Sequence, residues 1–526
     1  MPEPLVVENL SVSRHRPGAR DETPDPILRS VDLTVAQGEF VAIVGASGSG
    51  KTMTARAVMG LLPHQVRVDS GAITLGGTDL VNANETELNK VRGGRIGMLH
   101  QQPKRMFNPR MRIGRHVAEP LKLHRGLRRG EAKDTILELL AEVGFDDPAT
   151  IAAAFPHELS GGMAQRAMMA VALAGQPGLL LADEPTSALD KVLERQILQL
   201  IDRQRHNRGL GILYITHDLS TAAAFADRLI VMDRGRIVET GTAKQVLNTP
   251  RTDTSRALVA ASALVRADGA ATAVEHRVVL DLQSVTKRFH RKASPALDDV
   301  SLQLRQGEIL GVLGQSGSGK STMARLLVQL GAPDAGTIKD TTDGGIQLVF
   351  QEPHDVFDPR LNLRRSLEAP LLNRRGLPGS GCSAEVEQAV RDVELQPEIL
   401  DRYPGQCSGG QLQRLTIARA LLTKPSVLIC DEATSALDTV TQKKILDLLI
   451  RLHRDKDMTL MVISHDLNVI RYMSHRVAIL HQGRLVEVSS TTDFFARPQH
   501  EHSKQLLAAT SSRPGPTPQN APSAGA

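Results

Sequence analysis

The chain has 526 residues, which is enough for two or three domains with ordinary hydrophobic cores. Its 63 Lys and Arg against 58 Asp and Glu leave a net charge of +5, too small to argue for a nucleic-acid or anionic-membrane partner. No run reaches the roughly 18 apolar residues of a transmembrane helix, and an N-terminal stretch with Glu3 and Glu8 does not read as a signal peptide. Three cysteines without a CxxC pair, and no Trp, argue against a disulfide framework, a zinc site and a stacking platform for single-stranded nucleic acid.

The apolar runs of the first half are short and predict buried strands. They cover residues 40–44, 179–182, 212–216 and 229–232. Runs of this length without polar alternation suit strands that are covered on both faces, as in a parallel sheet. Residues 132–143 and 191–204 between them have helical patterns. We therefore predict an α/β fold.

The second half repeats this order, with predicted strands at 309–313, 427–430, 459–464 and 477–480. We predict two domains, 1–265 and 278–510, joined by a small polar linker at 266–277 and followed by a disordered tail at 511–526 that is rich in Pro, Ser, Gly and Ala. The stretch from Lys51 to Gln101 is longer than that from Lys320 to Gln351. We expect the extra residues to form a longer loop or an extra strand at a surface edge.

A phosphate-binding sequence occurs twice, as GASGSGKT at 45–52 and GQSGSGKS at 314–321, each between an apolar run and a helical pattern. A single glycine-rich turn with a lysine occurs by chance, but two in this context predict loops whose backbone N–H groups close around phosphate. The predicted phosphate-binding residues are Gly45, Ser47, Gly48, Ser49, Gly50, Lys51 and Thr52, with Gly314, Ser316, Gly317, Ser318, Gly319, Lys320 and Ser321. Thr52 and Ser321 are also predicted ligands of Mg²⁺.

Two acidic residues end a buried strand in each half, in LLLADE and VLICDE. A strand that ends in solvated acids is common, but both copies continue into the same DE[PA]TSALD pattern. We predict that Asp183 and Asp431 hold Mg²⁺ and that Glu184 and Glu432 polarise the attacking water as general bases. The pattern therefore predicts ATP hydrolysis at two sites.

The full order of motifs is a phosphate loop, a lone Gln, SGG, a hydrophobic run with DE, SALD and HD, found twice. It resembles the nucleotide-binding domain of the ATP-binding cassette (ABC) family, twice over, across about residues 5–510. The resemblance implies the fold of that family in each half. This fold is a P-loop α/β core, an antiparallel β subdomain and a helical subdomain that carries the SGG signature.

The resemblance also implies an intramolecular head-to-tail dimer, in which each ATP lies between one phosphate loop and the signature of the other domain. Site one would use Lys51, Thr52, Gln101, Asp183, Glu184 and His217, with Ser408, Gly409 and Gly410 from the second domain. Site two would use Lys320, Ser321, Gln351, Asp431, Glu432 and His465, with Ser160, Gly161 and Gly162 from the first. The two His would contact the γ-phosphate, and the two Gln would sense it through magnesium.

Members of the family usually stack an aromatic residue on adenine shortly after the first strand. Phe289 fits this position in the second half, whereas the first half offers only Arg14, His15 and Arg16. An arginine plane could substitute for the aromatic ring. We expect site one to bind ATP more weakly than site two.

The segments HQQPKRMFNPRM and FQEPHDVFDPRL resemble the ATPases of oligopeptide, dipeptide and nickel importers. This implies a peripheral protein at the cytoplasmic face of a bacterial inner membrane, which powers import of a peptide, nickel or a metal chelate. Its partners would be two membrane permease subunits and a periplasmic or extracellular solute-binding protein, and it would bind no nucleic acid.

Three other readings stay open. Tandem ABC ATPases that act on ribosomes usually have a long charged helical linker, and only 266–277 is available here. Repair and chromosome ATPases of the superfamily carry inserted coiled coils or zinc modules, for which the sequence shows no pattern. A regulatory ATP binder with inactive sites is disfavoured because both Glu184 and Glu432 are present.

Overall fold

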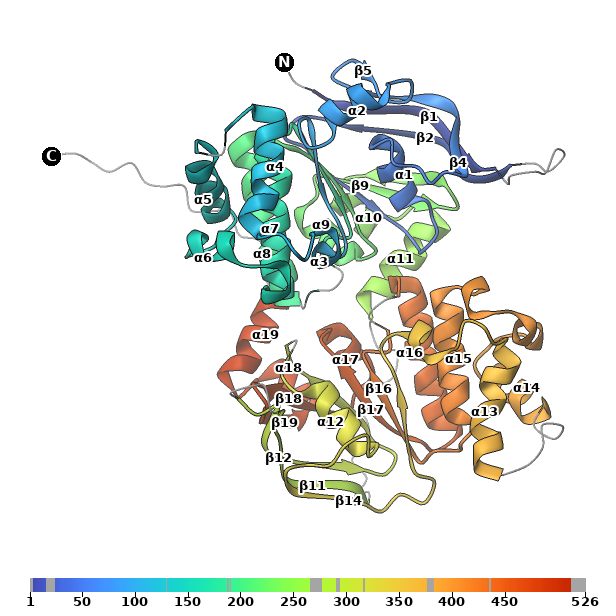
Figure 1. The fold of residues 1–526 in the computed structure, drawn as a ribbon. Coiled ribbons are helices and arrows are strands. Elements are labelled where there is room, and N and C mark those ends of the chain that lie inside the picture. Colours follow the sequence, from blue (N-terminus) through green and yellow to red (C-terminus); the bar gives the residue numbers. More distant parts are fainter. Residues whose placement is uncertain are drawn as a thin grey trace. The chain divides into compact units, whose positions relative to one another are not determined.

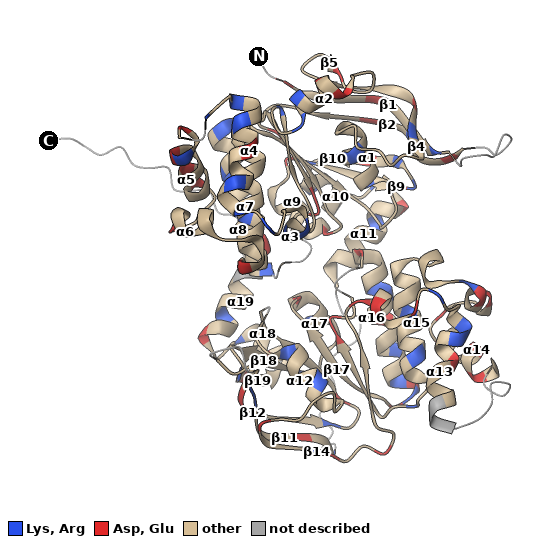
Figure 2. Ribbon diagram, viewed as in Figure 1, with Lys and Arg blue, Asp and Glu red and all other residues tan. Residues whose placement is uncertain are grey.

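The computed structural model describes residues 3–15, 24–128, 130–186, 189, 191–264, 277–289, 294–315, 317–375, 383–434 and 437–511. They divide into two compact units within Met1–Ser262 and Ala263–Ser512 (Figure 1). The predicted linker lies outside the described residues except for Arg277, and the predicted tail does so except for Ser511. Each unit is α/β, and acidic and basic residues are interspersed over both (Figure 2), in line with the small net charge.

The first unit is built on a six-stranded sheet in the order β10-β9-β3-β8-β7-β6. Its strands are β3 (Phe40–Val44), β6 (Ile96–Leu99), β7 (Leu179–Asp183), β8 (Gly211–Ile215), β9 (Arg228–Asp233) and β10 (Arg236–Gly241). All neighbours run parallel except β10, which is antiparallel to β9. The four predicted strands of this half are thus confirmed as a parallel sheet. Their apolar runs are buried, and one face of the sheet shares a core with α1 and the antiparallel strands.

An antiparallel sheet of the first unit has the order β2-β1-β4-β5. Its strands are β1 (Leu5–Arg14), β2 (Asp25–Val35), β4 (Val66–Leu75) and β5 (Thr78–Asp79). It shares one core with the parallel sheet, in which Leu10, Leu28 and Ile43 are fully buried. The longer stretch of this half forms the edge strand β5, as expected, and also α2 (Glu85–Val91), which the sequence analysis did not predict.

The α-helices described in the first unit lie between and after these strands. They are α1 (Lys51–Val58), α3 (Pro103–Met106), α4 (Ile113–Arg125), α5 (Ala132–Glu142), α6 (Pro148–Ala153), α7 (Gly161–Ala174), α8 (Lys191–Arg208), α9 (Leu219–Phe225), α10 (Ala243–Asn248) and α11 (Asp253–Ala263). The predicted helices at 132–143 and 191–204 are confirmed as α5 and α8. Helices α4, α5 and α7 pack on one another and form a helical part beside β6.

The second unit repeats this plan, with a sheet in the order β15-β16-β17-β13-β18-β19 and an antiparallel sheet in the order β12-β11-β14. Its strands are β11 (Val278–Lys287), β12 (Leu297–Arg305), β13 (Ile309–Leu313), β14 (Ala335–Asp340), β15 (Ile346–Val349), β16 (Val427–Asp431), β17 (Thr459–Ser464), β18 (Arg476–His481) and β19 (Arg484–Ser490). Its helices are α12 (Lys320–Leu327), α13 (Leu363–Arg375), α14 (Ser383–Asp392), α15 (Gly409–Leu421), α16 (Thr439–Asp455), α17 (Leu467–Met473), α18 (Thr491–Ala496) and α19 (Glu501–Ser511). The expected fold class is confirmed in both units.

Candidate functional site

Each predicted phosphate loop joins the central strand of a parallel sheet to the N-terminus of a helix, β3 to α1 and β13 to α12. Lys51 is only 6% exposed, and its ammonium donates to the carbonyl oxygens of Gly45 at 2.7 Å and Ala46 at 2.9 Å. Lys320 makes the same pair of bonds, to Gly314 at 2.7 Å and to the next residue at 3.0 Å. Both lysines therefore lie curled inside their loops, where a bound phosphate would attract the ammonium.

Only glycine suits the last position of each loop before the lysine, Gly50 and Gly319. Gly50 has φ +108° and Gly319 has φ +107°, a left-handed region that disfavours any residue with a Cβ atom. A Cβ on Gly50 would lie 2.7 Å from Leu28 Cδ2, and one on Gly319 would lie 2.4 Å from the oxygen of Ala296. The other predicted loop residues, Gly45, Ser47, Gly48 and Ser49 with Gly314, Gly317 and Ser318, lie in the same two loops, while Ser316 lies outside the described residues.

The first acid of each pair lies beside the hydroxyl residue of its phosphate loop. Thr52 Oγ1 donates to Asp183 Oδ1 at 3.1 Å. Burial raises the pKa of Asp183 above its usual value, although the bond from Thr52 opposes the change. Burial likewise raises the pKa of Asp431 against the effect of a hydrogen bond from Ser321, and Asp431 Oδ1 is buried with no partner among the described residues. Hydroxyl and carboxylate oxygens around an unsatisfied acceptor suit a hard divalent cation such as Mg²⁺.

The second acid of each pair has an unusual backbone. Glu184 has φ +45° and Glu432 has φ +49°, although neither is a glycine. Each N–H donates to the last part of the neighbouring strand, to Ile215 O at 2.9 Å and to Ile463 O at 3.0 Å. Such left-handed residues cost roughly 1–3 kcal/mol each and persist where the surroundings fix them. The bend turns each glutamate out of its strand at the carboxyl edge of the sheet.

In the first unit three predicted side chains meet at this bend. Gln101 Nε2 donates to Glu184 Oε2 at 3.3 Å, and His217 Nδ1 lies 3.5 Å from Glu184 Oε1. Burial lowers the pKa of His217, but the hydrogen bond and the charge of Glu184 raise it by more, so it lies above the usual value. The glutamate therefore has the glutamine on one oxygen and the histidine on the other.

The second unit has the same cluster. Gln351 Nε2 donates to Glu432 Oε2 at 2.9 Å, and His465 Nδ1 lies 3.4 Å from Glu432 Oε1. Burial raises the pKa of Glu432, but the hydrogen bond and charge of His465 and the charge of Lys320 lower it by more. Glu432 is therefore held ionised, as a general base must be before it accepts a proton.

The two signature sequences begin helices in the helical part of each unit. Ser160 is the N-cap of α7 and accepts from Met163 N at 3.3 Å, and Ser408 is the N-cap of α15 and accepts from Gln411 N at 3.3 Å. Ser160, Gly161, Ser408 and Gly409 are exposed. Within the described part of each unit, Ser160 bonds to Met163 and Ser408 bonds to Gln411, each at the start of its own helix. The signatures are thus presented outward and do not join the cluster of their own unit.

The second glycine of each signature lies against the helix that follows the strand with the two acids, α8 after β7 and α16 after β16. A Cβ on Gly162 would lie 3.3 Å from Leu193 Cδ2. A Cβ on Gly410 would lie 2.5 Å from Thr441 Cγ2, closer than two carbon atoms can approach. The small residues at these positions therefore let α7 and α15 start close to α8 and α16.

The predicted adenine-stacking residue Phe289 follows β11 and is 49% exposed, so its ring is open to a ligand. At the corresponding place after β1, His15 Nε2 lies 3.1 Å from Asp69 Oδ1. Arg14 is the last residue of β1, and Arg16 lies outside the described residues. The two units therefore differ at this position as the sequence indicates.

The aspartates that follow the two histidines were not predicted to have a role, but both begin helices. Asp218 is the N-cap of α9 and accepts from Thr221 N at 3.1 Å, and Asp466 is the N-cap of α17 and accepts from Asn468 N at 2.8 Å. An Asp directly before a helical pattern is the signal that predicts such a cap. These caps fix the loop that carries each histidine.

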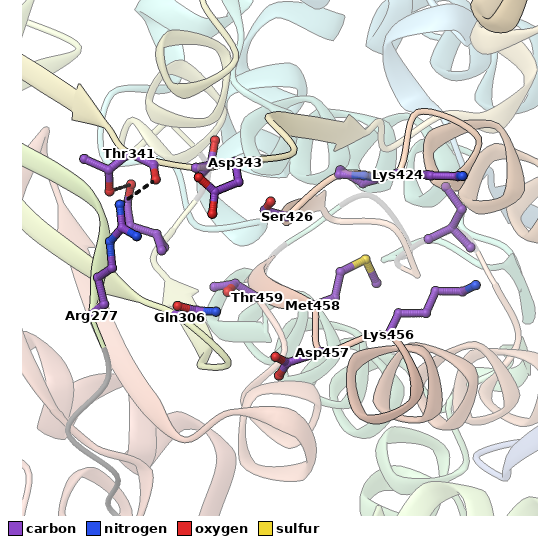
Figure 3. Close-up of a pocket in the computed structure, with 14 residues that line it drawn as sticks. Arg277, Gln306, Thr341, Asp343, Lys424, Ser426, Lys456, Asp457, Met458 and Thr459 are labelled. Atoms are coloured by element: carbon purple, nitrogen blue, oxygen red, sulfur yellow. Dashed lines mark hydrogen bonds between the residues drawn. The ribbon is translucent and has the colours of Figure 1, made fainter.

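A separate pocket of about 480 Å³ lies in the second unit (Figure 3). Its lining includes Lys424 and Ser426 just before β16 and Thr459 at the start of β17. Arg277 on its wall donates from Nη2 to the oxygen of Thr341 at 3.3 Å. The predicted ATP-binding residues of this unit follow the carboxyl ends of the strands, so this pocket does not belong to the predicted ATP site.

Comparison with known proteins agrees with this geometry. The ABC transporter family model matches residues 28–187 and 297–435. The chain is 38% identical to the peptidoglycan transport ATP-binding protein YejF of Agrobacterium fabrum over 96% of both chains. It is 36% identical to the glutathione import ATP-binding protein GsiA of Escherichia coli K12, over 96% of this chain and 89% of that protein.

Among solved structures, the chain is similar to the archaeal ribosome recycling factor aABCE1, determined in complex with the ribosomal stalk protein aP1. The TM-score is 0.61 at 19% identity, over 91% of this chain and 90% of that one. At this identity the likeness extends to the fold and not to the ribosomal role. Both halves match the same family model, and relatives match over nearly the whole length. The chain therefore belongs to the ABC transporter family, as an ATP-binding and ATP-hydrolysing protein with two cassettes.

Proposed function

We propose that the two units form two composite ATP sites, each completed by the signature of the other unit. The observation that carries this proposal is the matched cluster of glutamate, glutamine and histidine beside each phosphate loop. The outward-facing signatures support it, because exposed serine and glycine N–H groups at a helix start can bind a phosphate from another unit. Site one would then contain Lys51 and Ser408, and site two Lys320 and Ser160.

In this proposal the lysines leave their loop carbonyls to bind the β- and γ-phosphates. Glu184 and Glu432 accept a proton from the attacking water, and each paired histidine holds its glutamate and the γ-phosphate in line. Thr52 with Asp183, and Ser321 with Asp431, would hold Mg²⁺, and Gln101 and Gln351 would complete its sphere through water. Mg²⁺ neutralises charge that develops on the transferred phosphoryl group.

The test replaces each glutamate by glutamine, which keeps the shape and removes the base. Glu184→Gln with Glu432→Gln should retain MgATP and lower the rate of hydrolysis by about 10²–10⁴-fold. A double variant with near wild-type turnover would exclude these residues as the bases. Asp355→Asn, in the short helical turn after Gln351, changes an acid outside both clusters and serves as the matched control.

We also propose that the two sites differ in affinity, because the second unit has the exposed ring of Phe289 where the first unit has His15 paired with Asp69. Lys320→Ala removes the phosphate-loop lysine of site two, so its ATP binding reports site one, and Lys51→Ala reports site two in the same way. ATP should bind more tightly to the Lys51→Ala variant. Equal dissociation constants for the two variants would remove the inequality from the account.

For the transport role, we propose that the chain energises import of a peptide or peptide-bearing solute through two permease subunits and a solute-binding protein, at the cytoplasmic face of a bacterial inner membrane. The names of the two relatives, which concern glutathione and peptidoglycan, support peptide chemistry over nickel or a metal chelate. In the described residues no helix is long and apolar enough to cross a bilayer. Membrane attachment would therefore depend on the permeases.

The test compares uptake of labelled glutathione and of labelled peptidoglycan fragments in native cells with and without the gene. Loss of uptake of one of them, with rescue by the wild type and not by the Glu184→Gln and Glu432→Gln variant, is expected. Purification of the tagged chain should recover permease subunits. Recovery of ribosomes in their place, with normal uptake, would support the ribosomal alternative.

A further inference from the structure

The first unit contains an ion pair between the start of helix α8 and the loop that carries His217. Lys191 is the first residue of α8, and its ammonium lies 2.5 Å from Asp218 Oδ2. The same ammonium lies 2.9 Å from Glu194 Oε2, one turn along α8. Asp218 directly follows His217, so one lysine charge lies a single residue away from the histidine that contacts Glu184.

Asp218 is held from several sides. Its carboxylate accepts from Thr221 N at 3.1 Å and Thr221 Oγ1 at 2.9 Å, and its own N–H donates to Thr216 Oγ1 at 3.1 Å. Burial raises the pKa of Asp218, but the charge and hydrogen bond of Lys191 lower it by much more. The aspartate is therefore a fixed anion, and Lys191 is the cation that compensates it.

The second contact of Lys191 leads back toward the strand with the two acids, β7. Glu194 is 7% exposed, and its Oε1 accepts from Thr186 Oγ1 at 3.0 Å. Thr186 lies two residues after Glu184 and 3.2 Å from the hydroxyl of Tyr214 on β8. The network thus joins the segment after the glutamate to the segment after the histidine.

Of the three charged residues of this network, Lys191, Glu194 and Asp218, only Asp218 has an identical counterpart in the second unit. Thr439 begins α16 where Lys191 begins α8, and Gln442 takes the place of Glu194. Gln442 Nε2 donates to Thr434 Oγ1 at 3.4 Å, a neutral version of the bond between Glu194 and Thr186. Asp466 remains as the helix cap, but a threonine has no ammonium to pair with it. The clusters of glutamate, glutamine and histidine are alike in the two units, but the contacts that hold the histidine loops differ.

We propose that Lys191 is a positioning residue for ATP hydrolysis at the first site, where it holds the loop of His217 in place through Asp218. Without this cation, the carboxylates of Glu194 and Asp218 would lose the positive charge that they share, and the loop would shift away from Glu184. The inference rests on the proposed roles of Glu184 and His217. It adds a cause of inequality between the sites that is independent of adenine stacking.

The experiment uses the full chain with Glu432→Gln, in which the second site has lost its proposed base, so that kcat and KM report ATP hydrolysis at the first site. Lys191→Met keeps the length of the side chain and removes its charge, so kcat should fall by about three- to tenfold with KM unchanged. Lys191→Arg keeps the charge and should restore most of kcat. Lys133→Met is the control, because Lys133 lies exposed on α5 and is no part of this network, so it should leave kcat unchanged.

A double variant separates positioning from general damage. Because Lys191 acts through His217, Lys191→Met should lower kcat no further once His217→Ala is present, and additive losses would overturn the inference. If Lys191→Met does not fold, Lys191→Thr with Glu194→Gln reproduces the pair Thr439 and Gln442, and it should show the same loss of kcat. An unchanged kcat in either variant also overturns the inference. The proposed function itself fails in a different result, an unchanged kcat in His217→Ala alone.

Discussion

Glu184 has a backbone conformation that favours glycine. Replacing it by glycine should therefore remove strain while it also removes the carboxylate, so its effects on stability and on activity can be told apart. The φ of Glu184 is +45°, and its N–H is bonded to Ile215 O at 2.9 Å. Alanine in this region keeps a strain of about 1–2 kcal/mol that glycine does not have. The greater chain entropy of unfolded glycine offsets roughly 0.5–1 kcal/mol of that gain. Glu184→Gly should therefore be more stable than Glu184→Ala, by up to about 1.5 kcal/mol.

For a unit of this size, each 1 kcal/mol shifts the midpoint by about 2–4 °C, so the calorimetric midpoints of the first unit in the two variants should differ by up to about 6 °C. Arg203 lies exposed in the middle of α8 and gives the matched control. There alanine should be more stable than glycine by roughly 1 kcal/mol, so the order reverses. Both Glu184 variants should lose hydrolysis at site one. An alanine variant at position 184 more stable than the glycine variant by roughly 1 kcal/mol, as expected at position 203, would show that the bend is not strained.

Three further predictions concern single residues. Gly410→Ala should destabilise the second unit by about 1–3 kcal/mol, because the new Cβ meets Thr441, whereas Gly409→Ala should change stability little; equal Tm shifts would contradict the packing. Burial raises the pKa of Cys430 to about 12, so thiol reagents should leave it unlabelled until the chain unfolds, and rapid labelling of the native chain would contradict this. Burial raises the pKa of Glu239, but hydrogen bonds, including those from the N-terminal side of α11, lower it by more. The ionised Glu239 therefore stabilises the fold at pH values above its unfolded pKa of about 4.3, and this stabilisation is lost as the pH falls through the lowered pKa of the folded state. Glu239→Gln should lower the free energy of unfolding by about 1–3 kcal/mol at pH 7 and by less near pH 3, which urea titrations at both pH values check.

Most of each phosphate loop and signature could be predicted from the sequence because their geometry is local. Gly50 and Gly319 have the positive φ that a loop closing around an anion requires, within one short motif. Ser160 and Ser408 begin helices because a serine N-cap needs only the N–H group three residues on. The strands at 40–44 and 309–313 were predictable because fully apolar runs of this length leave few alternatives.

Contacts across long separations were predictable only through the family resemblance. Gln101 and Glu184 are 83 residues apart, and no local pattern places their side chains 3.3 Å apart. No sequence pattern indicates the ion pair of Lys191, since a lysine at the start of a helix is usually a solvated surface residue. Helix α2 was missed even though Asn84 and Glu87 form a capping box, the local signal that would have found it.

The most direct test of the central account asks which unit's signature completes which site. Photoreactive azido-ATP would be bound to the full chain with Glu184→Gln and Glu432→Gln, and labelled peptides would be mapped to each phosphate loop. Adding Ser408→Arg should remove the label from the loop of Lys51 and leave it on the loop of Lys320. Loss of label from the loop of Lys320 alone would contradict the head-to-tail arrangement.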